Sequence, residues 1–483
     1  MDSLLRPRAH ELARTDLDST ASATRLIGRV VFYGLLVLMA LTAVPYGTVE
    51  PWPEALFEGA VFALCILFVI EGYLSGSWRI NGLPLLYPAI ALIGFSLLQS
   101  LALWPANVSA AGHGKVWLAI SADPYESRRF ALKLAALTIA GALLMRYAVT
   151  RQRLKILINV VIGIGVASAV FGILRQALQR QKGFLLPLLP FAQGYAQFIN
   201  KNHFAFLMEM ALGLGLGLII ARGVRRERVL MYVAALLAVW TALVLSNSRG
   251  GLLAMMGQLV FTLVLFIRRR TRKGSDASKQ GQPGRVRRSA RVLALQIALV
   301  LSLVIAVVLG VIWIGGDPLV SSIEGASTEL QETPSASREG ARRRDIWRAS
   351  WQMFKANQIA GAGLGGYWAA VPQYHDASGQ MTPQQAHNDY LELLASGGLI
   401  GAAIGVWFLI LLVQRLRLAI RAHDSLYRSG ACGVAITVMG VAVHSLFDFG
   451  LHIAINALIF FSLLAIVCAA AQTSVSVNKA ITD

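Results

Sequence analysis

VLMYVAALLAVWTALVLS (229–246) is an apolar segment without a single charged residue, and its two flanks differ in charge. RGVRRER (222–228) precedes it, and SNSRGG (246–251) follows it. A bilayer core about 30 Å thick requires a helix of about 20 apolar residues. Because Lys and Arg gather on the cytoplasmic side of a membrane, this segment is predicted to be a transmembrane helix that starts at the cytoplasmic face.

Segments of similar length recur along the 483 residues. Of all residues 56% are hydrophobic and 14% charged, with a mean hydropathy of +0.60, whereas a water-soluble surface needs more charge. No segment shows the ten-residue alternation of a membrane barrel, so an all-α integral membrane protein is predicted. The twelve expected spans are 26–44, 55–74, 84–104, 130–150, 154–174, 203–221, 229–246, 250–267, 292–314, 398–414, 431–447 and 451–472.

The 44 Lys and Arg residues set the expected orientation, because most of them fall on one side of this series of spans. The positive-inside rule then places both termini in the cytoplasm. The first span has no cleavage site after it and is expected to remain in the protein. The predicted organisation is a cytoplasmic tail (1–25), helices one to nine (26–314), a large outer loop (315–397), helices ten to twelve (398–472) and a second cytoplasmic tail (473–483).

The net charge of +19 raises the question of a nucleic-acid partner. The basic residues instead form short clusters between apolar segments, which suits lipid headgroups and topology, so no nucleic acid is expected. Basic residues on the outer side oppose the charge rule and indicate an anionic ligand there, unless they are ordinary interfacial side chains. They are Arg175, Arg180, Lys182, Lys201, Arg249, Arg338, Arg342, Arg343, Arg344, Arg348 and Lys355.

The outer loop contains two predicted helices. ARRRDIWRASWQMFKA (341–356) has an apolar face with two Trp residues, which fits a helix in the headgroup plane or a cap packed on the bundle. GAGLGGY (361–367) matches the spacing of a dinucleotide-binding motif. No strand precedes it and no βαβ unit surrounds it, so we expect a hinge between the loop helices.

The second loop helix is predicted to begin at Thr382, with Pro383 in its first position and Gln385 completing a capping box. His387 then falls in the second turn, and Gly397-Gly398 ends the helix. The positive end of the helix dipole disfavours a charged imidazole, which suits His387 to act as a base. A packed histidine is the alternative. The same helical face would carry Tyr390, Leu391 and Leu394.

His387-Asn388, nine residues and then Gly398-Leu399-Ile400-Gly401 resemble the H-[NSQ]-x9-G-x-x-G signature of the O-antigen ligase family. The resemblance extends over most of residues 195–460 and includes four further stretches. It departs from the family pattern at Ser396, where an acidic residue is common, and at Ala454, where proline is usual. The four stretches are NKNHFAF (200–206), SNSRGG (246–251), RRDIWR (343–348) and HSLFDFGLH (444–452).

This resemblance implies a GT-C-like glycosyltransferase of the bacterial inner membrane, with its active site at the periplasmic face. The donor would be an undecaprenyl diphosphate-linked glycan, moved without metal or other cofactor and with inversion. A ligase transfers it to lipid A-core, and a polymerase to another lipid-linked repeat unit; polysaccharide assembly proteins would be further partners.

Three side chains are assigned catalytic roles on this basis. His387 would be the general base, and Arg249 and Arg343 would stabilise the leaving diphosphate, because a guanidinium offers a two-pronged, permanently charged grip. Arg342 or Arg344 could replace Arg343 in this role. The wider donor-binding set is Arg249, Arg343, Arg344 and Lys201, and the supporting residues are Asn202, His203, Asn388, His444 and Asp448.

Two alternatives remain open at this level. His444, Asp448 and His452 recur every four residues, a spacing that can bind zinc, although structural or acceptor-side contacts are the preferred interpretation. A polysaccharide transporter or flippase is the competing class of protein. It predicts ionisable residues near mid-membrane and two matching halves. The expected spans are mostly free of central charge, with Glu71 and Glu209 near span ends or isolated, and no repeat is visible.

Overall fold

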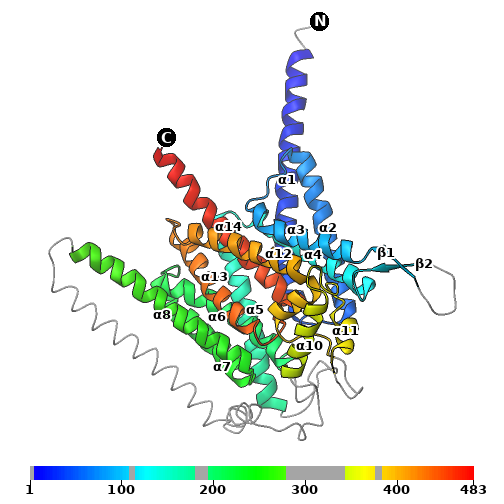
Figure 1. Ribbon diagram of the computed structural model, residues 1–483. Coiled ribbons are helices and arrows are strands. Elements are labelled where there is room, and N and C mark those ends of the chain that lie inside the picture. Colours follow the sequence, from blue (N-terminus) through cyan, green and yellow to red (C-terminus); the bar gives the residue numbers. More distant parts are fainter. Residues whose placement is uncertain (1–4, 108–114, 180–193, 279–342, 376–382, 483) are drawn as a thin grey trace.

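The computed structural model describes residues 5–107, 115–179, 194–278, 343–375 and 383–482 (Figure 1). These residues form a helical bundle with one two-stranded hairpin. The apolar helices are α1 (Leu5–Ala43), α2 (Pro51–Ser75), α3 (Tyr87–Gln99), α4 (Pro124–Tyr147), α5 (Arg151–Gln179), α6 (Lys201–Ile220), α7 (Val229–Leu245), α8 (Arg249–Ser278), α12 (Asp389–Ala419), α13 (Ser425–His444) and α14 (Ala454–Thr482). Shorter elements are η1 (Leu83–Leu86), β1 (Ala102–Asn107), β2 (Lys115–Ala119), η2 (Arg226–Arg228), α10 (Arg343–Ala356), α11 (Tyr367–Ala370), η3 (Val371–Gln373) and η4 (Gly450–His452).

Nine helices among the described residues are long and apolar enough to cross a membrane, which makes this a multi-pass membrane protein. Two further predicted spans correspond to shorter apolar helices, Leu83–Gln99 and Arg249–Leu265. The predicted span 292–314 lies outside the described residues, so the count of twelve stays a prediction. The third span was placed too far along the chain: its helix ends at Gln99, whose side chain bonds to backbone groups of a distant loop, and β1 follows.

Helix α14 is the centre of the bundle, since the apolar part of this helix is entirely buried by its neighbours. Helices α6 and α13 pack closely beside it (Figure 1). A Cβ atom on Gly217 would lie 2.1 Å from the Cα atom of Gly433, so the two backbones meet only because both residues lack a side chain. Small residues favour such close helix contacts inside membranes. At the other end of α6, where the candidate site lies, a Cβ on Gly450 would lie 2.0 Å from the Phe206 ring, so glycine permits close packing there as well.

The loop helices form a small core of their own beside the bundle. The amphipathic helix expected at 341–356 is present as α10, but its buried face is rotated from the predicted one. Ile346, Ala349, Ser350 and Met353 are buried, whereas Trp351 is 47% exposed. The reason is tertiary: the Ser350 hydroxyl lies 2.7 Å from the Tyr367 hydroxyl, and the small Ala349 permits close packing.

The glycine-rich segment 361–367 connects α10 to α11 and packs tightly, rather than as an open hinge. A Cβ on Gly361, where φ is +68°, would lie 2.3 Å from the Ser396 backbone. The Gln99 side chain donates to the carbonyls of Ala360 (2.6 Å) and Ser396 (3.1 Å), and accepts from the Leu364 N–H (3.0 Å). Only glycine permits this approach of two backbones.

Helix α12 is broken at Gly398, which has φ 61° and ψ −157°. The predicted helix end therefore becomes a kink, and the helix continues to Ala419. The break removes intrahelical partners from the next two N–H groups. Those of Leu399 and Ile400 donate instead to the carbonyls of Gln358 (2.8 Å) and Ile359 (3.2 Å). The kink thus joins the outer loop to the membrane helices.

We expect Gly398→Ala to destabilise this junction strongly. Its backbone conformation is essentially restricted to glycine, which alone costs about 1–3 kcal/mol for other residues. In addition, a Cβ would lie 2.4 Å from the Ile359 carbonyl oxygen. Thermal unfolding in detergent should show a clearly lower Tm. Gly94→Ala is the matched control, because a Cβ there meets no atom within 4 Å and alanine favours a helix. Equal Tm values for the two variants would contradict this account.

Candidate active site

His387 lies just before α12 and not in the second turn of a helix, so the predicted helix start was wrong. Its φ is +50°, and Asn388 is the N-cap, accepting a hydrogen bond from the Leu391 N–H. Pro383 and Gln385 are outside the helix, and Thr382 lies outside the described residues. Long-range contacts override the local capping signal here, as the neighbouring Ala386 shows.

Two side chains hold the backbone of Ala386. The Trp347 indole N–H of α10 donates to the Ala386 carbonyl (3.0 Å), and the Glu392 carboxylate of α12 accepts from its N–H (2.8 Å). The residue before His387 is therefore fixed from both sides, in a backbone that has already left the helix. Such fixing positions a side chain without the need for a regular helix.

The His387 ring pairs with Asp448, which lies between α13 and α14. Nδ1 of His387 is 3.3 Å from Oδ1 of Asp448; the histidine side chain is 31% exposed and the aspartate 1%. Burial raises the pKa of a carboxyl group. Here the hydrogen bond from His387, the neighbouring His203 and the Phe449 N–H outweigh burial, so the pKa of Asp448 lies well below its ordinary value of 3.8.

An ionised Asp448 accepts hydrogen bonds and cannot donate them. The Nδ1 atom of His387 therefore carries the hydrogen of this pair, and its Nε2 atom keeps a lone pair. This is the arrangement in which a carboxylate orients an imidazole that accepts a proton. The sequence named Asp448 only as a supporting residue; its pairing with His387, 61 positions away, comes from the fold.

The Phe449 ring lies at the centre of three histidine side chains and contacts each imidazole ring. Its ring centroid lies 4.8 Å from that of His203, 5.0 Å from that of His387 and 5.9 Å from that of His452. The three histidines come from the start of α6, the segment before α12 and η4. Three titratable side chains therefore contact one apolar ring at the same end of the bundle.

A basic cluster adjoins these histidines. The charges of Arg249 and Arg343 both act on the Lys201 ammonium, so the first residues of α6, α8 and α10 lie in the same region of the structure. Lys201 is only two positions from His203, in the same first turn of α6. The hydroxyl of Ser248 donates to the side-chain oxygen of Asn202 (2.7 Å), which ties the turn before Arg249 to α6.

His444 supports the position of Arg249 from inside the bundle. A Cβ on Gly250 would lie 2.7 Å from the His444 ring, so glycine beside Arg249 allows α8 to start against this imidazole. Nδ1 of His444 lies 3.1 Å from Oε2 of Glu209, and both side chains are completely buried. His444 is therefore a packed residue of the α6–α13 interface and does not reach the surface beside His387.

Two carboxylates beside His452 complete the surroundings, and the sequence analysis did not include these two acidic residues. Asp389 accepts a hydrogen bond from the Ser445 hydroxyl (2.7 Å) and lies 3.5 Å from His452; Glu392 lies 3.8 Å from the same ring. Asp389 and Glu392 occupy the first turn of α12, where acidic residues are common as dipole partners. Their position directly after His387-Asn388 was the available signal.

The structure separates the remaining candidates. Arg343 and Arg344 are both exposed, and the charge of Arg343 acts on Lys201. Arg342 lies outside the described residues. His444, Asp448 and His452 do not share one helical face, because α13 ends at His444; each has a different partner. Within the described part of the chain, no group of three or more His, Cys, Asp and Glu side chains is arranged to hold a metal ion.

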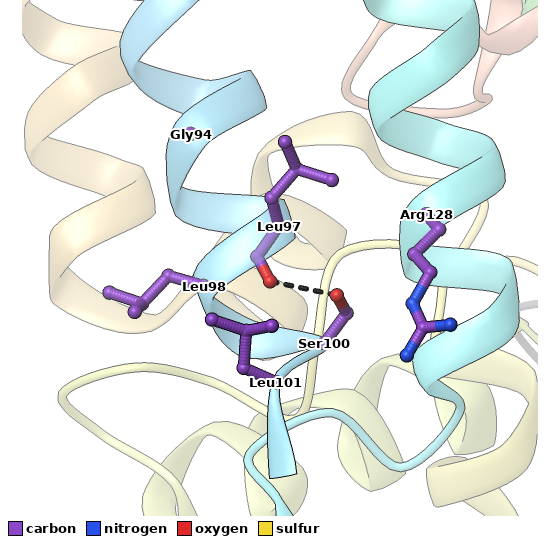
Figure 2. Close-up of a pocket in the computed structure, with 6 residues that line it drawn as sticks. All are labelled: Gly94, Leu97, Leu98, Ser100, Leu101 and Arg128. Atoms are coloured by element: carbon purple, nitrogen blue, oxygen red, sulfur yellow. Dashed lines mark hydrogen bonds between the residues drawn. The ribbon is translucent and has the colours of Figure 1, made fainter. Parts of the chain in front are cut away.

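One open apolar groove of about 460 Å³ lies elsewhere, between α3 and α4 (Figure 2). Figure 2 shows Arg128 of α4 across from Leu97 and Leu101, with the Ser100 hydroxyl donating to the Leu97 carbonyl (2.7 Å). The groove contains one cation and neither an acid nor a base. It therefore does not form a second reaction centre.

Residues 233–406 match the family described as O-antigen ligase. The matched region includes Arg249, Arg343 and His387, and ends within α12. This confirms the resemblance to the O-antigen ligase and polymerase superfamily, and it implies a glycosyltransferase-like enzyme that acts on lipid-linked glycans and polysaccharides. The search of curated proteins found no match.

Proposed function

We propose that this protein transfers a glycan from an undecaprenyl diphosphate-linked donor to an acceptor hydroxyl at the periplasmic face, with inversion at the anomeric carbon. The observation that carries the proposal is the junction of two groups at one end of the bundle. The His387–Asp448 pair is suited to remove a proton, and the Lys201, Arg249 and Arg343 cluster is suited to hold a diphosphate.

In the proposed step, the acceptor oxygen attacks the anomeric carbon while its proton passes to Nε2 of His387. The bond between that carbon and the diphosphate oxygen breaks, and its electron pair leaves with the diphosphate. The basic cluster stabilises the negative charge that develops on this leaving group. Asp448 keeps the imidazole in the required tautomer and stabilises the charged ring after proton transfer. Direct displacement of this kind inverts the configuration of the sugar.

Purified protein tests this activity directly. It is supplied with an undecaprenyl diphosphate-linked glycan and, in separate reactions, with lipid A-core or with a second lipid-linked repeat unit. We expect release of undecaprenyl diphosphate together with a lengthened acceptor. Product on lipid A-core defines a ligase, which the signature spacing around His387 favours, and product on the repeat unit defines a polymerase. Movement of the intact donor across the membrane without any new glycosidic bond would identify a transporter instead.

The proposed activity requires a particular membrane topology, with the active site on the periplasmic side. The distribution of basic residues predicts a cytoplasmic position for the 268–291 segment and a periplasmic position for the outer loop 315–397. We expect reporter domains fused after residues 280 and 360 to report opposite compartments. A protease added from the cytoplasmic side should leave the outer loop intact. Cleavage of that loop from the cytoplasmic side would contradict a periplasmic active site.

A further inference from the structure

A second cavity, which has a polar lining and a volume of about 640 Å³, lies at the other end of the bundle. Five elements contribute to it: α1, α2, the segment 76–82, α4 and α5. Helix α4 spans the bundle between the two ends, because its first residues adjoin the glycine-rich loop and its last residues line this cavity. Figure 1 shows α1 and α2 extending away from α10 and α11. The cavity is therefore separate from the candidate active site.

The lining is strongly basic. It includes Arg25, Arg29, Arg79, Arg146 and Arg153, against a single carboxylate, Glu71. Glu71 is already engaged: Arg146 donates to its two oxygens at 2.8 and 3.1 Å, and the Tyr147 hydroxyl donates to it at 3.0 Å. Among the side chains that the structure describes, the other four guanidinium groups donate to no carboxylate.

Arg146 and Arg153 are held in place by neighbouring groups. Arg25, Arg29 and Arg79 are exposed at the rim of the cavity. Arg153 donates to the Tyr147 carbonyl (3.2 Å) and lies over the Phe32 ring (5.2 Å). Arg25 and Arg29 are one helical turn apart on α1, and Gly28 between them lets the Tyr147 ring approach, since a Cβ there would lie 3.2 Å from it. Ordered guanidinium groups lose less entropy when they bind an anion.

The positive-inside rule explains why basic residues are found on this side, but not why those from four elements line one cavity. The exposed Trp78, which packs on Phe68 next to Arg79, indicates the level of the membrane interface. Guanidinium groups bind phosphate through paired hydrogen bonds. We propose that this pocket, defined by Arg25, Arg29, Arg79 and Arg153, binds a phosphate group at the membrane surface.

The phosphate can belong to an anionic phospholipid headgroup or to a soluble phosphate compound, and one experiment separates these sources. Full-length protein is placed in nanodiscs of phosphatidylcholine, with or without phosphatidylglycerol, and lipid retention is measured by native mass spectrometry. Inorganic phosphate is titrated separately against protein in the neutral nanodiscs, with Tm as the readout. Selective retention of phosphatidylglycerol indicates the headgroup, and stabilisation by inorganic phosphate indicates the soluble source.

The double variant Arg25→Gln/Arg29→Gln should weaken the observed binding about tenfold or more. Arg225→Gln/Arg228→Gln removes the same charge from the 222–228 loop, which does not line this cavity, and should bind as the unchanged protein does. Tm in neutral lipid checks folding, and Arg79→Gln replaces the double variant if that protein is unstable. Equal losses in pocket and control variants, or no binding of either probe by the unchanged protein, would overturn the proposal. These readouts are independent of glycan transfer.

Discussion

His387→Ala is expected to lower glycan transfer about 100-fold or more, while membrane insertion and donor-lipid binding remain normal. The reason is the position of the ring: it is 31% exposed, and its Nδ1 is bonded to Asp448, so Nε2 is the atom left to accept the acceptor proton. Transfer is measured with purified protein, donor lipid and acceptor, per folded molecule. A packed histidine would behave differently, with a lower protein yield and an unchanged specific activity.

The pH dependence adds a second test of the same role. The rate should fall in acid, because a protonated imidazole cannot accept a proton. Asp448 does not account for this fall, since its pKa is depressed: its contribution is present above the ordinary carboxyl pKa and is lost only in strong acid. Partial removal from water, followed by the charges of Lys133 and His203, lowers the pKa of His452 to about 4, so His452 is neutral near pH 7.

Two further variants separate the neighbouring groups. Asp448→Asn keeps the size of the side chain but permits the wrong imidazole tautomer, so it should lower the rate with little effect on donor binding. His452→Ala removes the other partly exposed imidazole, whose side chain is 33% accessible. If His452→Ala abolishes transfer while a well-folded His387→Ala protein stays fully active, the base is not His387. A chelator is expected to leave the rate unchanged.

Arg249→Lys is expected to lower donor turnover about as much as Arg249→Ala does, although the lysine keeps the positive charge. An ammonium cannot reproduce the two-pronged grip of a guanidinium on phosphate, and its flexible stem is not held in the same way. Removing a group that stabilises leaving-group charge commonly costs several kcal/mol, or about 100-fold in rate. Arg249 is the first residue of α8 and belongs to the same basic cluster as Lys201 and Arg343.

Donor turnover is the measurement, followed as release of undecaprenyl diphosphate by correctly inserted protein. Arg128→Lys is the matched control, because Arg128 lies near the same end of the bundle at the start of α4, beside the apolar groove of Figure 2. We expect this control to retain normal turnover. Near-normal turnover by Arg249→Lys would show that a point charge is sufficient and would remove the two-pronged contact from the mechanism.

The sequence alone determined the membrane class, the positions of most helices and the amphipathic character of α10. These properties are local: insertion depends on hydropathy summed over about 20 neighbouring residues, and helical amphipathicity depends on spacing within a few turns. The sequence also selected His387, Arg249 and Arg343 as candidates, through motifs that the family match at 233–406 includes.

Tertiary structure decided how these residues meet. The helix begins after Asn388 rather than at the capping signal of Thr382–Gln385, because Trp347, 39 positions away, and Glu392 of α12 fix the backbone of Ala386. The pairing of His387 with Asp448 joins residues 61 positions apart, and the contacts of Phe449 bring together histidines from three separate segments. Such contacts depend on how helices pack, which local periodicity does not specify.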